Sequence, residues 1–329
     1  MNRTIARFVR GFFVFLEGKA INTAVLHGWH DDFENELSDV DFVISPEGFR
    51  DFVPLVHEWC QLQGWRLCQV LRHETVATYC VCAGTDPDFV VALDACSDYQ
   101  RNGIRYLTHQ ELLANRIRLP WGGYRVGESV EICYRFAKAA AKHKNAEVAT
   151  REFLRYSADA RSRCEECLLD HYGLVLGGWD VKTVRRTMKA LVKRRGTNKL
   201  RMLSGLLYKI VRKTARPDGL LVTMKGFWNP GLARELARRC GHLYFRRTVV
   251  EAHVRPSHAV ALLRTTMIVV ERMRPVERWL VFKACVFDLD PAWSVDECFA
   301  NLVSALHQRC LKREKLDQGV MAPDRAHHG

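Results

Sequence analysis

Residues 26–45 read LHGWHDDFENELSDVDFVIS, and this stretch decides how the first part of the chain folds. It contains a glycine after a short apolar run, then a polar segment, and then Asp39-Val40-Asp41 leading into a second apolar run. Side chains two positions apart on a strand project to the same face of the sheet, so Asp39 and Asp41 would present two carboxylates together. The preceding acids are most simply a solvated loop: Asp31, Asp32, Glu34 and Glu36.

A third carboxylate, Asp94, lies within the apolar run FVVALDACSDY. An acid that faces inward from such a strand is costly unless it is paired or bound to a metal ion. If its strand lies beside the strand of Asp39 and Asp41, three carboxylates converge. Mg²⁺ prefers oxygen ligands and keeps waters and substrate phosphates in its shell, so such a cluster favours Mg²⁺ or Mn²⁺ together with a nucleoside triphosphate.

These residues resemble the nucleotidyltransferase-fold, or polymerase-β-like, superfamily. Its pattern is Gly-[Gly/Ser], nine to thirteen residues, Asp-x-[Asp/Glu], and a later acid on a separate strand. Here Gly28-Trp29 is followed by nine residues, then by Asp39-Val40-Asp41, and Asp94 is the later acid. The expected order of a helix, two strands, a helix and three strands is also similar to that fold. Trp29 departs from the pattern, because the family has a small residue there.

The resemblance implies a role for each of these residues. Asp39 and Asp41 would bind two metal ions, and Asp94 would bind the catalytic metal and assist deprotonation of the acceptor. Two metals about 3.5 to 4 Å apart would stabilise the attacking and leaving oxygens at the α-phosphorus. Gly28 and Trp29 would lie against the triphosphate. For the neighbouring histidines we expect a structural or solvated role rather than a phosphate contact: His27 and His30.

Helical spacing dominates the next part of the chain, residues 119–215. Lys138 and Lys142 share one face of a predicted helix, where they would contact the triphosphate or form an exposed basic face. The segment 181–217 holds thirteen Lys or Arg and no Asp or Glu. It is a candidate for contact with nucleic acid or another anionic partner, and the alternative is a solvated helix face.

The segment Gly226 to Gly231 has the G-x-x-x-x-G spacing of a phosphate-binding loop, between a predicted strand and a predicted helix. The next two residues, Leu232 and Ala233, replace the Lys and the Ser or Thr that this motif uses on phosphate and Mg²⁺. Residues 216–312 therefore resemble a degenerate thymidylate-kinase-like P-loop module. An ordinary strand, turn and helix would explain the same residues.

The composition indicates the charge of the expected partners and the cellular compartment. The 329 residues carry a net charge of +13, which favours anionic partners. Most of the twelve cysteines lie in apolar runs, as free thiols do in a reducing compartment, and Cys164 and Cys167 are expected as a helical pair rather than a zinc site. No apolar run reaches the length of a membrane span, so we expect a cytoplasmic protein.

The sequence therefore predicts an α/β protein in four parts: an α+β nucleotidyltransferase-like sheet over 1–118, a basic helical region over 119–215, a small P-loop-like module over 216–312 and a flexible tail over 313–329. The expected function is metal-dependent transfer of a nucleoside monophosphate from a nucleoside triphosphate to an unidentified acceptor. The alternative is a catalytically inactive protein that binds nucleotide, nucleic acid or a partner.

Overall fold

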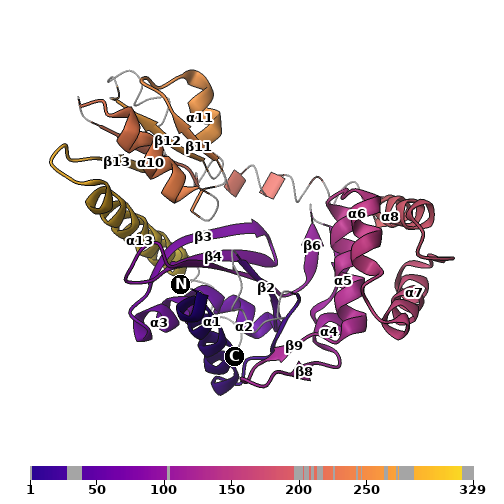
Figure 1. The fold of residues 1–329 in the computed structure, drawn as a ribbon. Helices are drawn as coiled ribbons and strands as arrows, with labels where there is room; N and C mark the ends of the chain where they lie inside the picture. Colours follow the sequence, from indigo (N-terminus) through magenta and orange to yellow (C-terminus); the bar gives the residue numbers. More distant parts are fainter. Residues whose placement is uncertain are drawn as a thin grey trace.

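A computed structural model describes most of the chain: residues 2–27, 39–101, 104–195, 203, 207–208, 211–212, 218–224, 227–241, 244–245, 247–262, 266–271, 273 and 285–320. Helices and mixed or parallel sheets alternate along it, which confirms the α/β class (Figure 1).

A seven-stranded sheet forms the centre of the first part, in the order β3-β4-β5-β2-β1-β9-β8. Its elements follow the predicted order, except that two helices replace the one expected between the second and third strands. They are α1 (Asn2–Gly18), β1 (Thr23–Val25), β2 (Asp39–Ile44), α2 (Pro46–Arg50), α3 (Phe52–Leu62), β3 (Arg66–Glu74), β4 (Ala77–Ala83) and β5 (Val90–Cys96).

The aromatic residues of α1 hold this helix and α3 against one face of the sheet. Phe12 and Phe13 are fully buried and make edge-on contacts with Phe42 of β2, at centroid distances of 6.2 and 5.1 Å. Trp59 of α3 donates its indole N–H to the Phe8 carbonyl at 3.2 Å. The helical spacing of the apolar residues in α1 thus gives the helix one buried face.

The segment 99–195 packs against the opposite side of the sheet; two of its strands extend that sheet, and two others form a separate hairpin. Its elements are β6 (Tyr99–Arg101), β7 (Ile104–Leu107), α4 (His109–Leu113), β8 (Ile117–Arg118), β9 (Tyr124–Arg125), α5 (Glu128–Ala141), α6 (Ala146–Phe153), α7 (Ala158–Tyr172) and α8 (Val181–Arg195). The expected boundary between 118 and 119 falls inside the β8–β9 hairpin. Because β9 also pairs with β1, sheet and helices share one hydrophobic core.

The third part contains a separate four-stranded sheet in the order β11-β12-β10-β13, with every neighbouring pair parallel. Its elements are β10 (Leu220–Thr223), α10 (Pro230–Cys240), β11 (Arg247–Val250), α11 (Pro256–Leu262), β12 (Thr266–Val270), β13 (Cys285–Asp288) and α13 (Val295–Val320). The helix α10 follows β10 as predicted, and the Asn229 side chain caps it by accepting a hydrogen bond from the Leu232 N–H at 3.0 Å.

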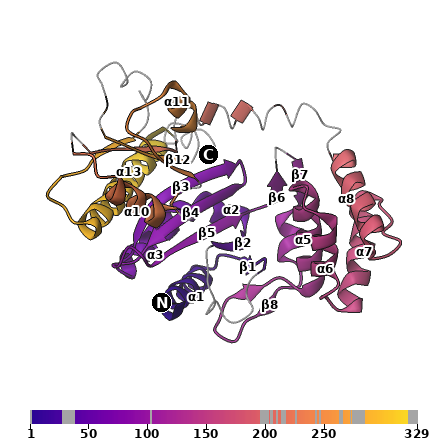
Figure 2. The same cartoon turned by 45° about the horizontal axis from the view of Figure 1, so that its top comes forward.

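The last helix joins the two sheets and corrects the predicted tail. Residues 313–320 belong to α13, because the sequence KREKLDQ continues the helix with good helix formers and no proline. His307 of this helix contacts the Leu67 carbonyl of β3 at 2.9 Å, and Cys310 is buried in the core of the first sheet. Figures 1 and 2 show α13 near β3 in two views of the molecule.

Candidate functional site

The two predicted acidic strands are neighbours in the sheet. β2 and β5 run parallel, with Asp41 opposite Asp94 and Asp39 opposite Ala92. Paired residues of neighbouring strands, and residues two apart on one strand, project to the same face. The carboxylates of Asp39, Asp41 and Asp94 therefore share one face of the sheet. Asp39 is exposed, Asp94 is half-buried and Asp41 is buried.

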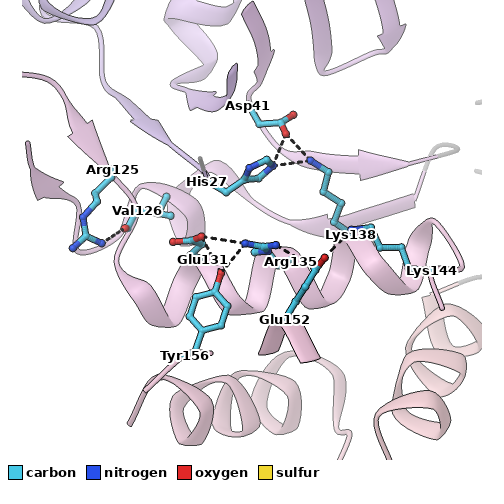
Figure 3. Close-up of polar contacts among 10 residues, drawn as sticks. All are labelled: His27, Asp41, Arg125, Val126, Glu131, Arg135, Lys138, Lys144, Glu152 and Tyr156. Atoms are coloured by element: carbon cyan, nitrogen blue, oxygen red, sulfur yellow. Dashed lines mark hydrogen bonds and ion pairs between the residues drawn. The ribbon is translucent and has the colours of Figure 1, made fainter. Parts of the chain in front are cut away.

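Two basic side chains meet at one oxygen of Asp41 (Figure 3). The Lys138 Nζ of α5 lies 2.6 Å from Asp41 Oδ2, and the His27 Nε2 lies 2.5 Å from the same oxygen. The two nitrogens are 3.0 Å apart, so the tautomer of His27 decides whether it donates to Asp41 or accepts from Lys138. The ring of Tyr134 lies beside both, 5.2 Å from the Lys138 nitrogen and stacked on His27.

The surroundings drive the pKa values of the two facing carboxyls apart. Burial by itself raises the pKa of Asp41, but the hydrogen bond with His27 and the charge of Lys138 outweigh it, so this pKa lies well below its usual range. Burial and the negative charge of Asp41 raise the pKa of Asp94 well above its usual range. The pair therefore favours one ionised carboxylate, Asp41, beside one protonated carboxyl, Asp94.

A polar network fixes the helix that carries Lys138. Glu131 of α5 is buried and accepts a hydrogen bond from the Tyr156 hydroxyl at 2.9 Å. Arg135, one turn further along α5, donates to that hydroxyl at 3.3 Å and to Glu152 of α6 at 3.1 Å. In Figure 3 this network and the Asp41 contact lie on different sides of α5. The network thus anchors the backbone of α5 to the neighbouring helices, whereas the Lys138 side chain reaches across to the sheet.

Lys142, the other predicted lysine, is exposed at the end of α5. The partial burial of its ammonium group and then the positive charge of Lys138 lower its pKa. Of the two lysines, Lys138 is the one in contact with a carboxylate of the site.

The donor set can be compared with the needs of a divalent cation. Within the ranges that the structure describes, no group of three or more His, Cys, Asp or Glu residues is arranged to hold a metal ion. Carboxylate oxygens are nevertheless the ligands that Mg²⁺ prefers, and a cation between Asp41 and Asp94 would relieve the repulsion that raises the pKa of Asp94. The carboxylates are thus of the ligand type that a divalent cation takes, and the ammonium of Lys138 already supplies positive charge next to Asp41.

Several predicted residues lie outside the described part of the chain: Gly28, Trp29, His30, the acids of 31–36 and Gly226. The expected triphosphate contacts of Gly28 and Trp29 therefore remain predictions. Sequence reasoning missed His27, for which it expected no role at the carboxylates. The signal was its place directly after β1, because β1 pairs with β2 and Val25 lies opposite Phe42, next to Asp41.

Leu232 and Ala233, at the positions where a phosphate-binding loop would carry Lys and Ser or Thr, are core residues of the third part. Both side chains are buried in the apolar core formed by α10 and the parallel sheet. They therefore serve packing, and neither side chain can supply charge or a hydroxyl to a phosphate.

The remaining sequence features have plain structural counterparts. Cys164 and Cys167 both lie on α7 beside Cys133 of α5, and the described cysteines are free thiols. The helix α8 buries Val184 and Leu191 against α5 and α6 and exposes a stripe of basic residues: Lys182, Arg185, Arg186, Lys189 and Lys193. In the described part of the chain, no helix combines the length and apolarity needed to cross a membrane.

Comparison with known proteins gives no family for this chain. No protein-family model matches it, and no curated protein matches it either.

Proposed function

We propose that this protein is a metal-dependent nucleotidyltransferase that transfers a nucleoside monophosphate from a nucleoside triphosphate to an acceptor. The observation that carries the proposal is the parallel pairing of β2 with β5, which sets Asp41 beside Asp94 with Asp39 on the same face. The resemblance to the nucleotidyltransferase fold in motif spacing and element order supports it.

The roles of the residues follow from their surroundings. A bound Mg²⁺ or Mn²⁺ would neutralise phosphate charge during the displacement. Asp39 and Asp41 would hold it, and Asp41 is suited to this because its pKa is low and it stays ionised. Asp94, whose raised pKa makes it a stronger base once ionised, would accept the proton of an acceptor hydroxyl. Lys138 would offer positive charge to the triphosphate, with Gly28 and Trp29 against it.

The basic helical region suggests the kind of partner. The thirteen Lys or Arg of 181–217 leave 37 basic residues in the rest of the chain, against 37 acidic residues in the whole of it. The entire net charge of +13 therefore lies in this one segment. The basic stripe of α8 is exposed on the side away from its buried contacts, which suits a nucleic-acid backbone or another polyanion.

Transfer of an α-phosphate label tests the proposal. The purified protein is incubated with α-labelled nucleoside triphosphates, Mg²⁺ or Mn²⁺, and either RNA or a cell extract. We expect labelled product with the wild type and at least a hundredfold less with Asp41→Asn, since a residue of the reacting site is removed. Asp170→Asn, which neutralises an exposed acid of α7, is the matched control and should label as the wild type does.

One observation favours a second candidate, a nucleotide-binding protein without turnover. Asp41 is already in contact with Lys138 and His27, so this oxygen has partners within the chain itself. Calorimetric titration with nucleoside triphosphate separates the two. If the affinity for the nucleotide is the same with and without Mg²⁺ and persists when Asp39 and Asp41 are both changed to Ala, the transferase is ruled out and the binding protein is supported.

A further inference from the structure

Asp41 carries its counter-charge within the chain itself. The ammonium of Lys138 contacts Asp41 Oδ2 at 2.6 Å, and the side chains of Lys138 and Asp41 are only 17% and 11% exposed. Salt and water screen such an enclosed pair far less than a surface pair. A positive charge thus already lies in direct contact with one of the oxygens that would bind a metal ion.

A divalent cation and this ammonium compete for the same oxygen. Mg²⁺ binds carboxylate oxygen at about 2.0 to 2.1 Å, and a second cation in contact with that oxygen would be strongly repelled. The metal can therefore occupy Asp41 Oδ2 only when Lys138 moves away.

We propose that Lys138 is a resident counter-cation which a divalent metal displaces from Asp41, and that the displaced ammonium then pairs with the triphosphate of the donor nucleotide. This inference rests on the proposed nucleotidyltransferase function and adds a coupling between its two ligands. With metal and nucleotide both bound, the lysine has exchanged one anionic partner for another, so neither Asp41 nor Lys138 is left without an opposite charge.

The structure permits this exchange by movement of one side chain. The network of Glu131, Arg135 and Tyr156 holds the backbone of α5, so the helix stays in place. Lysine has a compact ammonium on a flexible four-carbon stem, which can turn about its own bonds. The partner that remains at Asp41 is His27.

The exchange makes metal and nucleotide bind cooperatively. Metal alone breaks the Lys138–Asp41 ion pair without giving Lys138 a new partner, whereas metal with triphosphate gives it one. Each ligand therefore raises the affinity for the other by the same factor, as thermodynamic linkage requires. Part of this coupling factor between metal and nucleotide binding comes from the positive charge of Lys138.

The test measures Mn²⁺ affinity by the paramagnetic resonance of free Mn²⁺, with and without a non-hydrolysable nucleoside triphosphate. Lys138→Met keeps the apolar stem and removes the charge. We expect it to bind Mn²⁺ alone roughly tenfold or more tightly than the wild type, because an enclosed ion pair no longer has to be broken. We expect it to bind the nucleotide more weakly and to lose most of the coupling factor.

Lys144→Met is the control for a general loss of positive charge. Lys144 is exposed near the end of the same helix and lies 3.8 Å from Glu152, away from the carboxylates. Its Mn²⁺ affinity should stay within about twofold of the wild type, since exposed charges are screened.

The outcomes distinguish this inference from the proposed function. Unchanged or weaker Mn²⁺ binding in Lys138→Met, with wild-type thermal unfolding, overturns the counter-cation role alone. No Mn²⁺ binding to wild type or variant, with or without nucleotide, overturns the metal-dependent function as well. If Lys138→Met unfolds, Lys138→Gln gives the same comparison with a polar side chain.

Discussion

Replacement of Asp94 by asparagine should make the protein more stable. Asp94 lies opposite Asp41 on the neighbouring parallel strand, and burial together with the charge of Asp41 raises its pKa. At neutral pH the folded chain must either hold a proton on Asp94 or keep two negative charges together, and the unfolded chain has neither cost. Asparagine has the same shape without the charge and can still donate a hydrogen bond to Asp41.

The size of the effect follows from the strand spacing. Neighbouring strands lie about 4.8 Å apart, and two charges at about 5 Å with an effective dielectric constant of about 20 repel by about 3 kcal/mol. Protonation of Asp94 relieves part of this repulsion in the wild type. We therefore expect Asp94→Asn to raise the free energy of unfolding by about 1 to 3 kcal/mol.

The stability difference between Asp94→Asn and the wild type should depend on pH. The ordinary pKa of 3.8 applies to Asp94 in the unfolded chain, and the folded pKa is higher. Below pH 3.8 both states are protonated and wild type and variant should be equally stable. The advantage of the variant should appear as pH rises above this value and grow until the folded pKa is reached.

Urea unfolding followed by circular dichroism between pH 3 and pH 8, with a chelator present, measures this difference. Asp39→Asn is the matched control, because Asp39 is exposed on the neighbouring strand β2 and its replacement should change stability by less than about 0.5 kcal/mol. A destabilised Asp94→Asn, or a gain that is the same at every pH, would refute the reasoning about the carboxyl pair.

Two further predictions concern other parts of the chain. The side chain of His258 is buried, its Nδ1 accepts a hydrogen bond from the Arg255 N–H, and burial lowers its pKa below 6.5. The stability that neutral His258 contributes above pH 6.5 should therefore be lost as the pH falls below this value. In His258→Gln, the free energy of unfolding measured in urea should depend less on pH between pH 7 and pH 5. For the exposed stripe of α8, binding of duplex DNA or RNA should weaken steeply with salt. In a triple Gln variant of Lys182, Arg185 and Lys189, the slope of log K against log salt should fall by about 0.9 for each phosphate that is no longer neutralised. Nucleic-acid binding that is insensitive to salt, or a variant with an unchanged slope, would contradict the assignment of this stripe.

The sheet around the acids could be predicted because each signal was local. Short apolar runs define β2 and β5, and the spacing of Asp39 and Asp41 places their side chains on the same face. The helical period of Phe8, Phe12 and their neighbours likewise gave the buried face of α1. Such periodicities depend on a few adjacent residues and survive in any compact fold.

The contact between Lys138 and Asp41 could not be predicted in the same way. The two residues are 97 positions apart, and their meeting depends on how α5 packs across the sheet. A helical pattern tells which residues share a face, and it does not tell which element that face meets. The helix over residues 313–320 differs from the flexible tail expected there, because these polar turns carry no apolar period and are helical by propensity alone.

The position of Lys138 also changes where the functional unit ends. The family resemblance covers residues up to about 118, yet β9 completes the sheet beside β1, and α5 supplies the cation at Asp41. A chain cut at 118 would keep all three carboxylates and lose the charge that balances the buried one. Asp41 would then lose its ammonium partner and keep the contact with His27. The helical region is therefore part of the site, and its basic helix α8 lies on the same helical layer as the lysine that contacts Asp41.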